Sequence, residues 1–262
     1  MSYQKLGVIK FGKALLTTGD LDPMYIALWE AKLDQNRLKR WLLAYWYFYA
    51  GGVSSKLSYY EGKDFFRKAL QLAKPESKTP RGTERRHFRG EACLDSIRYF
   101  HDKYDSPEQA IDHLLAKSHG NVLGVVSFVK ERWPLFGPWI GFKIADMLER
   151  LDITHISFPI KTLEMYSEPT KGAELICKKK GWDWDRLRVS GTVLKLLETF
   201  SEYKAPPRYE RPCNVQEVES ICCKVKSHWN GHYPVGKDTR EIREGLEGWG
   251  KLAKRLEKHL PK

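Results

Sequence analysis

The sequence predicts a mainly α-helical protein, and three observations carry this prediction. Apolar residues recur at helical spacing in segment after segment, whereas strand-like alternation of apolar and polar residues is scarce. Residues that cap helices stand before several of these segments, and Pro or Gly follows them. The 262 residues contain no internal repeat and suffice for a substantial core. We expect a single all-helical domain over 1–262, divisible into two lobes: 1–133 with the C-terminal helices, and 134–205.

The first helices are indicated by their caps. Asp22 stands where it can cap one helix, and Asp34 can cap a second helix that runs through Ala50. Apolar residues cover nearly all faces of the second helix, so we expect it to be buried. Gly51-Gly52 should end it, and residues 54–56 would then form a turn whose N–H groups can face an anion. The glycine and lysine spacing of a nucleotide-binding P-loop is absent.

The rest of the chain continues the helical pattern. We expect further helices over 61–73, 91–104, 107–117, 121–133, 138–151, 163–166, 171–180, 191–203, 215–229 and 238–259. A short extended piece fits 154–159. Residues 74–90 are too rich in Pro and Gly for a regular element, and Pro206-Pro207 predicts a break before the last third.

The composition narrows the range of partners. A net charge of +12 favours an anionic partner, most often nucleic acid, although a dispersed solubilising surface is the alternative. No apolar run approaches the ~20 residues that span a bilayer, and the N-terminus lacks a secretory signal. Five unevenly spread cysteines do not resemble a disulfide framework, so we expect a reducing cytoplasm and no membrane partner.

The segment 133–151 is the first candidate binding element. A tight turn at Phe136-Gly137 leads into a helix that begins at Pro138, whose missing N–H is no loss at that position. The first-turn N–H groups point back at the turn and can hold a phosphate. A helix–turn–helix element of the core is the alternative. The residues expected to meet an anion here are Gly137, Pro138, Trp139 and Lys143.

An arginine-rich loop is the second candidate. Four arginines lie within nine residues, with a histidine among them: Arg81, Arg85, Arg86, His87 and Arg89. Arginine presents a fixed fork of donors that matches phosphate oxygens. Gly82 and Gly90 bracket the loop and would let the backbone approach a ligand. The alternative is a solvated charged loop.

The third candidate is the segment 213–238. Its helix has an apolar stripe, and a second face carries Glu219, Cys223 and Lys226 at three- and four-residue spacing. Glu217 or Glu219 can act as a catalytic carboxylate, and a structural ion pair is equally compatible with either. The turn after the helix is dense in groups that bind ligands from loops. Those groups and their neighbours are Lys226, His228, His232, Tyr233 and Lys237.

Metal binding and base stacking are two further possibilities for these segments. Residues Cys213, Cys222, Cys223, His228 and His232 are of ligand type, but no Cys-x-x-Cys pair accompanies them. We therefore expect no metal site and buried, apolar cysteines. The aromatic residues that could stack on an extruded base, or simply belong to the core, are Trp139, Tyr166, Trp182, Trp184, Trp229 and Tyr233.

Two resemblances give these segments a context. Gly137-Pro138-Trp139 followed by an apolar helix resembles the helix–hairpin–helix of DNA glycosylases, with Leu135 where that superfamily has an earlier glycine. The catalytic aspartate of those enzymes corresponds to Ile160 or Lys161 here. Without that carboxylate, cleavage of the N-glycosidic bond loses the group that stabilises the sugar cation. A DNA-docking element without the cleaving aspartate is what the resemblance implies.

Four segments of the chain together resemble a bacteriophage family, the α-glutamyl/putrescinyl-thymine pyrophosphorylases or amino acid:DNA transferases. These segments are residues 46–58, 81–90, 137–150 and 213–238. The resemblance implies a fold similar to DNA glycosylases and a part in thymine hypermodification. A kinase first pyrophosphorylates 5-hydroxymethyluracil in double-stranded DNA. The transferase then displaces pyrophosphate with the amine of an amino acid or polyamine. No cofactor is needed, although Mg²⁺ can accompany pyrophosphate.

The resemblance and the residue types together suggest a division of roles. The hairpin would anchor DNA while the base flips out, and the arginine-rich loop would hold pyrophosphate. Glu217 or Glu219 would be the general base for the amine, with Lys226 and His228 beside it. His232, Tyr233 and Lys237 would bind the donor or pyrophosphate. The alternatives are a glycosylase that excises a modified base and a non-enzymatic DNA-binding module.

Overall fold

The fold is that of a computed structural model, which describes residues 5–165 and 167–262. Within these residues the regular structure is helical, with one isolated β-bridge between Lys204 and Pro212, so the predicted mainly α class is confirmed. The helices follow in this order: α1 (Val8–Thr18), α2 (Pro23–Ala31), α3 (Gln35–Phe48), α4 (Gly51–Leu57), α5 (Gly62–Ala73), η1 (Pro75–Ser77), η2 (Thr83–Arg85), α6 (Gly90–Lys103), α7 (Pro107–Ser118), α8 (Val122–Arg132), α9 (Pro138–Arg150), η3 (Ile160–Met165), α10 (Ser167–Lys180), α11 (Trp184–Phe200), α12 (Val215–Trp229), α13 (Lys237–Leu246) and α14 (Lys251–Lys258).

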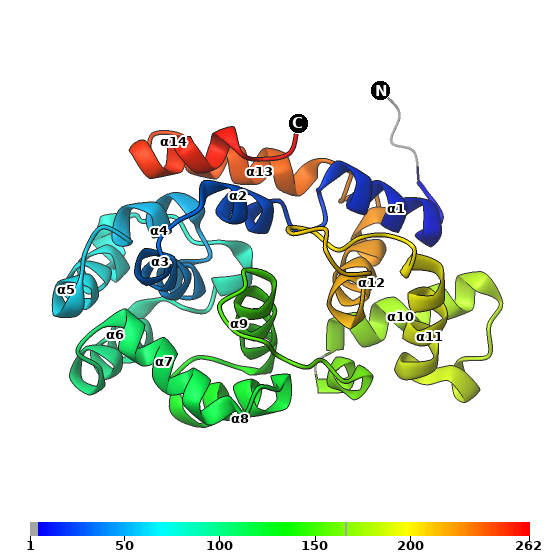
Figure 1. Cartoon of the computed structure of the whole chain (residues 1–262), viewed down its shortest axis with the longest axis horizontal. Coiled ribbons are helices and arrows are strands. Elements are labelled where there is room, and N and C mark those ends of the chain that lie inside the picture. Colours follow the sequence, from blue (N-terminus) through cyan, green and yellow to red (C-terminus); the bar gives the residue numbers. More distant parts are fainter. Residues whose placement is uncertain (1–4, 166) are drawn as a thin grey trace. The chain divides into compact units, whose positions relative to one another are not determined.

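The helices group into two compact units (Figure 1). The hairpin unit consists of Glu30–Ile156 and Ile242–His259. The three-segment unit consists of the N-terminal part up to Trp29, Ser157–Glu241 and Leu260–Lys262. The hairpin of 133–137 therefore shares a unit with the arginine-rich loop, whereas the segment 213–238 belongs to the other unit.

The hairpin unit has an aromatic core around α3. Tyr47 stacks on Phe88 at a ring distance of 5.5 Å and meets the edge of Phe100 at 5.3 Å. Phe136 from the hairpin joins the same cluster, 5.9 Å from Phe100. Asp34 caps α3 by accepting a hydrogen bond from a backbone N–H at 2.8 Å, as its position predicts. The prediction that this helix is buried on nearly all sides is confirmed.

The predicted anion-binding turn after Gly51-Gly52 is wrong, because this stretch forms the helix α4. The hydroxyl groups of Ser54 and Ser55 donate to backbone carbonyl groups one turn earlier and are buried. A Cβ atom on Gly52 would lie 2.2 Å from the ring of Trp249. Gly52 therefore lets α4 approach the stretch that leads into α14, and it faces protein instead of a ligand.

Several other helices also differ from the expectation. The single helix predicted over 238–259 is divided into α13 and α14, because Gly248 and Gly250 adopt positive φ angles of 77° and 92° between them. Helix α11 begins at Trp184, where Asp183 caps it through the N–H of Arg186 at 3.1 Å. Helix α1 was not predicted. Helix caps and helix-breaking glycines therefore determine these boundaries, and the sequence-based prediction did not include all of them.

The three-segment unit is built around α12. Helices α10 and α11 pack on α12 and on each other, and α1 packs on α12 from the far end of the chain. Two glycines permit close helix contacts. A Cβ atom on Gly172 would lie 1.9 Å from the carbonyl oxygen of Cys222, and one on Gly12 would lie 2.4 Å from the ring of Phe200. No helix among the described residues is long and apolar enough to cross a membrane.

Candidate DNA-binding site

The hairpin joins two helices that pack closely along their lengths. Helix α8 is capped by Asn121, which accepts from an N–H at 2.8 Å, and ends at Arg132. Helix α9 begins at Pro138, as predicted. A Cβ atom on Gly141 would lie 3.1 Å from the Cα atom of Val126, so a small residue is needed where α9 crosses α8. The structure thus contains a helix, a five-residue connection and a helix, and their equivalence to the glycosylase element stays a prediction.

The hairpin is held from the protein interior. Trp133 and Phe136 are buried and bonded to each other through their backbones at 3.1 Å. The hydroxyl of Ser96 donates to the carbonyl of Pro134 at 2.7 Å, and Arg85 donates to the carbonyl of Leu135 at 3.0 Å. Two consecutive carbonyl groups of the connection are therefore fixed by side chains from other elements. This makes the hairpin a preorganised structure.

Like Pro134, Leu135 is not buried. Its side chain is 43% exposed, and its φ angle is +65°, in the left-handed region. A non-glycine residue pays roughly 1–2 kcal/mol for this conformation. The resemblance to the glycosylase hairpin predicts a glycine at this position, and the backbone here has a conformation that glycine adopts without steric cost.

The start of α9 is open to an anion. Gly137 is the N-cap residue and is exposed, and Pro138 occupies the first helical position. Within the part of the chain that the structure describes, no side chain caps this helix, and no acidic residue lies in its first turn. A Cβ atom on Gly137 would meet nothing within 4 Å. The N–H groups of the first turn and the positive end of the helix dipole are therefore available, as phosphate binding requires.

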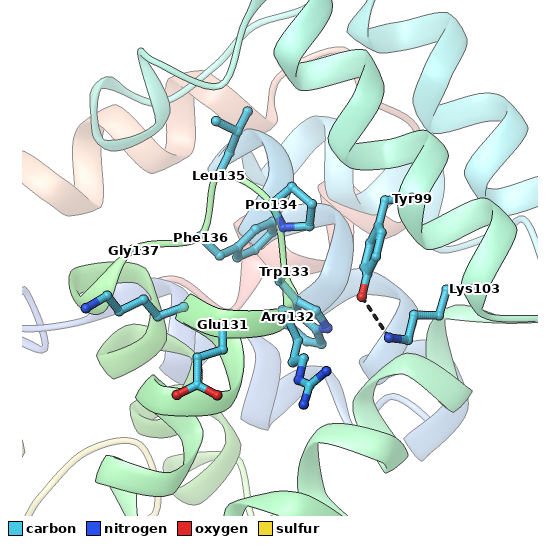
Figure 2. A pocket seen from close by; sticks show the side chains of 10 residues that line it. Tyr99, Lys103, Glu131, Arg132, Trp133, Pro134, Leu135, Phe136 and Gly137 are labelled. Carbon is cyan, nitrogen blue, oxygen red and sulfur yellow. Dashed lines mark hydrogen bonds between the residues drawn. The ribbon is translucent and has the colours of Figure 1, made fainter.

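A basic cavity of about 770 Å³ lies against the hairpin and is called the hairpin pocket (Figure 2). It is lined by the connection 133–137 and by Tyr99, Lys103, Lys130, Glu131 and Arg132. Lys103 donates to the hydroxyl of Tyr99 at 2.8 Å. Three cations and one carboxylate give the pocket a positive balance suited to an anionic ligand. Figure 2 shows the side chain of Leu135 directed away from Trp133 and Phe136.

The arginine-rich loop divides into inward and outward residues. Arg81 donates to the backbone carbonyls of Phe88 at 2.7 Å, Ala73 at 2.9 Å and Thr79 at 3.3 Å. It therefore holds the loop together from within. Three of the predicted residues, by contrast, have exposed side chains, which is what contact with pyrophosphate requires: Arg86, His87 and Arg89. Binding of pyrophosphate by these three stays a prediction.

Arg85 is buried, with 7% of its surface exposed. Its guanidinium packs against the rings of Phe88 and Phe136, at 4.4 and 4.6 Å from their centres. Burial lowers the pKa of Arg85 to about 10, so the side chain is still charged at neutral pH. Its Nη2 atom has no hydrogen-bond partner among the described residues. The lowered pKa corresponds to a free-energy cost of roughly 3 kcal/mol for keeping the buried guanidinium charged. Arg85 supports the hairpin from the protein interior.

Lys143 and Trp139 lie deeper than expected for surface contacts. Lys143 is buried, and its Nζ atom is 3.9 Å from a carboxylate oxygen of Asp146. Arg150 lies 3.9 Å from the other oxygen. The spacing of these residues at three and four positions on α9 would have revealed the cluster in the sequence. Trp139 is half-buried, with its ring 5.6 Å from that of Tyr49. Contact of Lys143 or Trp139 with DNA stays a prediction.

Glu217 has a clear structural environment. It lies in a capping box with Asn214 at the start of α12, where its Oε2 atom accepts the Asn214 N–H at 2.8 Å. Arg211 donates to both of its oxygens, at 3.0 and 3.2 Å. Glu219 is also buried, and its Oε1 atom accepts from the Sγ of Cys223 at 2.9 Å. The two carboxylates that the sequence left equivalent thus differ in their surroundings.

His228 is buried and joins distant parts of the chain. Its Nε2 atom accepts the N–H of Leu6 at 2.8 Å, and its Nδ1 atom lies 2.8 Å from the carbonyl oxygen of Tyr233. The first bond makes Nε2 an acceptor, so the proton belongs on Nδ1. The ring also stacks on Phe11 at 4.1 Å. Lys226 and His232 are exposed, and Lys237 donates to the carbonyl of His232 at 3.2 Å.

A buried carboxylate that the sequence analysis missed organises the turn after α12. Asp20 is fully buried and accepts from the N–H of Gly236 at 2.7 Å and from the hydroxyl of Tyr233 at 3.3 Å. Its other oxygen accepts the N–H and hydroxyl of Thr239 at 2.9 and 2.8 Å. Burial and neighbouring carboxylates raise the pKa of Tyr233, so its hydroxyl remains protonated. The partners are more than 200 positions apart, so no local signal marks them.

Lys224 completes this network. Its Nζ atom donates to the carbonyl groups of Asp20 and Leu21 and lies 2.8 Å from the carboxylate of Asp238. Burial acts to lower the pKa of Lys224, but the carboxylates of Asp238, Asp22 and Asp20 outweigh it and raise the pKa. A positive charge at this position therefore ties the N-terminal segment to the start of α13.

The candidate cysteines and the candidate tryptophans of the three-segment unit are buried or half-buried. Cys93, Cys177, Cys213 and Cys222 are buried and free, as expected for apolar cysteines, and Cys223 is half-buried. In residues 5–165 and 167–262, no group of three or more His, Cys, Asp or Glu side chains is arranged to hold a metal ion. Trp182, Trp184 and Trp229 are half-buried in the three-segment unit, and Tyr166 lies outside the described residues.

Comparison with known proteins gives these features a family. The model of the amino acid:DNA transferase family matches residues 16–232. A glycinyltransferase of Pseudomonas phage PaMx11 is 40% identical over 97% of this chain and 94% of its own length. A putrescinyltransferase of Delftia phage PhiW-14 is 29% identical over 97% of this chain and 82% of its own length. The chain therefore belongs to the amino acid:DNA transferase family.

Proposed function

We propose that this transferase displaces pyrophosphate from 5-(pyrophosphoryloxymethyl)uracil in double-stranded DNA with the amine of an amino acid, a step of thymine hypermodification. As a member of its family the protein is an enzyme that transfers an amino acid to DNA. The observation that carries the finer proposal is the open start of α9 beside the cationic hairpin pocket. Both features suit a substrate with phosphodiester groups and a pyrophosphate.

The reaction forms one bond and breaks one. The amine nitrogen attacks the exocyclic methylene carbon, and the carbon–oxygen bond breaks with its electron pair leaving on pyrophosphate. One proton must leave the amine, and the charge that develops on pyrophosphate must be stabilised. The substitution needs no redox cofactor, and Mg²⁺ would enter with pyrophosphate.

DNA binding is assigned to the hairpin unit. The N–H groups at the start of α9 would contact a backbone phosphate, and Lys103, Lys130 and Arg132 would contact its neighbours. Because Arg85 bonds to Leu135, the arginine-rich loop adjoins the hairpin. Its three exposed members, Arg86, His87 and Arg89, would then meet pyrophosphate.

Glu219 is the better candidate for the general base. Glu217 already accepts three hydrogen bonds, two of them from Arg211, and protonation would break this arrangement. Glu219 is bonded to Cys223, which is half-buried and so links the carboxylate to the surface. An amine near Cys223 could pass its proton to Glu219.

Glycine is the donor that we propose. The relative with 40% identity is a glycinyltransferase, whereas the putrescinyltransferase shares 29%. In the segment 213–238, Lys226 and His232 are exposed and Lys237 is half-buried. These groups suit the carboxylate of an amino acid, whereas putrescine would bring a second ammonium group to them. The relatives come from bacteriophages, and we propose that the enzyme works on phage DNA in the host cytoplasm.

Mass spectrometry of nucleosides tests the proposal. Duplex DNA that carries pyrophosphorylated 5-hydroxymethyluracil is incubated with the protein and an equimolar mixture of glycine, glutamate and putrescine. We expect a glycine adduct at the methylene carbon and release of one pyrophosphate per adduct. Abasic sites formed without a donor would identify a glycosylase instead. Binding of DNA without any release of pyrophosphate would identify a non-enzymatic module.

A further inference from the structure

The apex of the hairpin presents the large apolar side chain of Leu135 to the outside, next to the exposed Pro134. Leu135 is 43% exposed, whereas Trp133 and Phe136 of the same connection are buried at 1% and 3%. The side chain extends away from both rings (Figure 2). Packing within the protein therefore does not account for a leucine at this position.

The backbone conformation sharpens this point. Leu135 adopts a φ angle of +65°, which glycine takes without steric cost and leucine does not. A strained conformation combined with an exposed apolar side chain directs attention to what the side chain does outside the protein.

The hairpin is also held rigidly behind that side chain. The carbonyl group of Leu135 accepts from the guanidinium of Arg85 at 3.0 Å, and the preceding carbonyl accepts from Ser96 at 2.7 Å. Arg85 itself is buried and packs against two phenylalanine rings. A side chain on such a support can push against another structure without the loop yielding.

Cations line the pocket that Leu135 also lines. Lys103, Lys130 and Arg132 belong to this hairpin pocket, and the uncapped start of α9 follows Leu135 at Pro138. Proteins that kink or open duplex DNA combine such features, because phosphate contacts fix the duplex while an apolar wedge separates two base pairs.

We infer that Leu135 is a wedge that inserts into the base stack of duplex DNA next to the thymine to be modified and so helps to expose that base. This inference rests on the proposed function, because it gives the wedge its substrate. It makes Leu135 a positioning residue that acts on the DNA, and it leaves the transfer chemistry to other groups.

The test compares Leu135→Gly with the wild type on two pyrophosphorylated substrates, a fully paired duplex and a duplex whose target base lies in an unpaired bubble. Because the wedge offsets the cost of unstacking a base step, we expect transfer to the paired duplex to fall about 10-fold or more without it. Transfer to the bubble should stay within about twofold, because the target base there is already unpaired. The melting temperature should not fall, since glycine suits the backbone at this position.

Two controls keep the outcome interpretable. Leu123→Ala removes another exposed leucine, 48% exposed on α8, and should change neither substrate. Leu135→Met retains an apolar wedge and should keep most of the activity on the paired duplex. Equal loss on both substrates, or no loss on the paired duplex, would overturn the inference.

A readout without chemistry separates this inference from the proposed function. A 2-aminopurine placed beside the target thymine brightens when the stack opens, whether or not transfer occurs. The wild type should raise its fluorescence in the duplex, and Leu135→Gly should raise it less. Absence of transfer by the wild type with this pattern intact would contradict the proposed reaction alone. Equal fluorescence with both proteins would contradict the wedge alone.

Discussion

Asp20→Asn should destabilise the protein severely without touching the exposed surface. The carboxylate is fully buried and accepts four hydrogen bonds, two on each oxygen. Asparagine keeps one oxygen and presents an NH₂ group to the donors that used the other. One buried backbone N–H is then unsatisfied, at about 1–3 kcal/mol, whereas the hydroxyl on the same side can turn to accept from the NH₂ group. The lost negative charge near the start of α13 adds up to about 2 kcal/mol.

The expected loss in the free energy of unfolding is therefore roughly 1–5 kcal/mol, against the 5–15 kcal/mol typical of a domain. Urea unfolding followed by circular dichroism at 222 nm, a helix signal, measures this loss. Asp185→Asn removes an exposed carboxylate of the same unit and should cost under about 0.5 kcal/mol. A loss below about 1 kcal/mol for Asp20→Asn would refute the reasoning, because it would mean that the donors find other partners.

Three further predictions follow from the site. Glu217→Gln should lower the free energy of unfolding by about 1–3 kcal/mol and leave kcat of the folded protein nearly unchanged. Glu219→Gln, by contrast, should lower kcat about 100-fold or more. Kinetics and urea unfolding of both variants check this pair of predictions. The Lys130→Ala/Arg132→Ala double variant should weaken DNA binding and reduce the slope of log K against log salt by about 2, one per lost phosphate contact, which a salt titration of DNA affinity measures. Thiol titration of the native protein should find one accessible cysteine, Cys223, because the other four are buried.

Each of these predictions has its own control and contrary result. A loss of kcat in Glu217→Gln equal to that in Glu219→Gln would remove the distinction between them. Lys258→Ala, an exposed lysine on α14, should leave the salt slope unchanged, and an unchanged slope in the double variant would place the phosphates elsewhere. Cys223→Ser should abolish the fast thiol reaction, and more than one fast thiol would contradict the burial.

Local signals in the sequence were sufficient for elements whose cause is local. The cap Asp34 and the start of α9 at Pro138 depend on residues within one turn, and both were predicted correctly. The capping box of Asn214 and Glu217 is equally local. Glu217 is nevertheless also a catalytic candidate in the sequence, because the sequence alone does not distinguish a glutamate that caps a helix from one that acts as a base.

Features that depend on distant partners could not be predicted. Gly52 stands where a turn would need glycine, but its reason is the ring of Trp249, far along the chain. Arg81 and Arg85 look like phosphate ligands in a sequence, yet Arg81 donates to a carbonyl of its own loop and Arg85 to the carbonyl of Leu135 in the hairpin. Asp20 meets its partners more than 200 positions away. Only the three-dimensional structure separates arginines that hold a loop from those that face outward.

The three-segment unit is assembled from parts of the chain that the ribosome synthesises at different times. The backbone of Leu6 bonds to the side chain of His228, which is 222 positions later. At ~5–20 residues per second, translation needs roughly 10–45 s to cover that distance. For that time α1 is complete but lacks α12, so the apolar side chains of Phe11 and Leu15 have no native cover. The nascent chain is then exposed to aggregation and chaperones, and the contiguous stretch 30–156 of the hairpin unit emerges complete before that cover arrives.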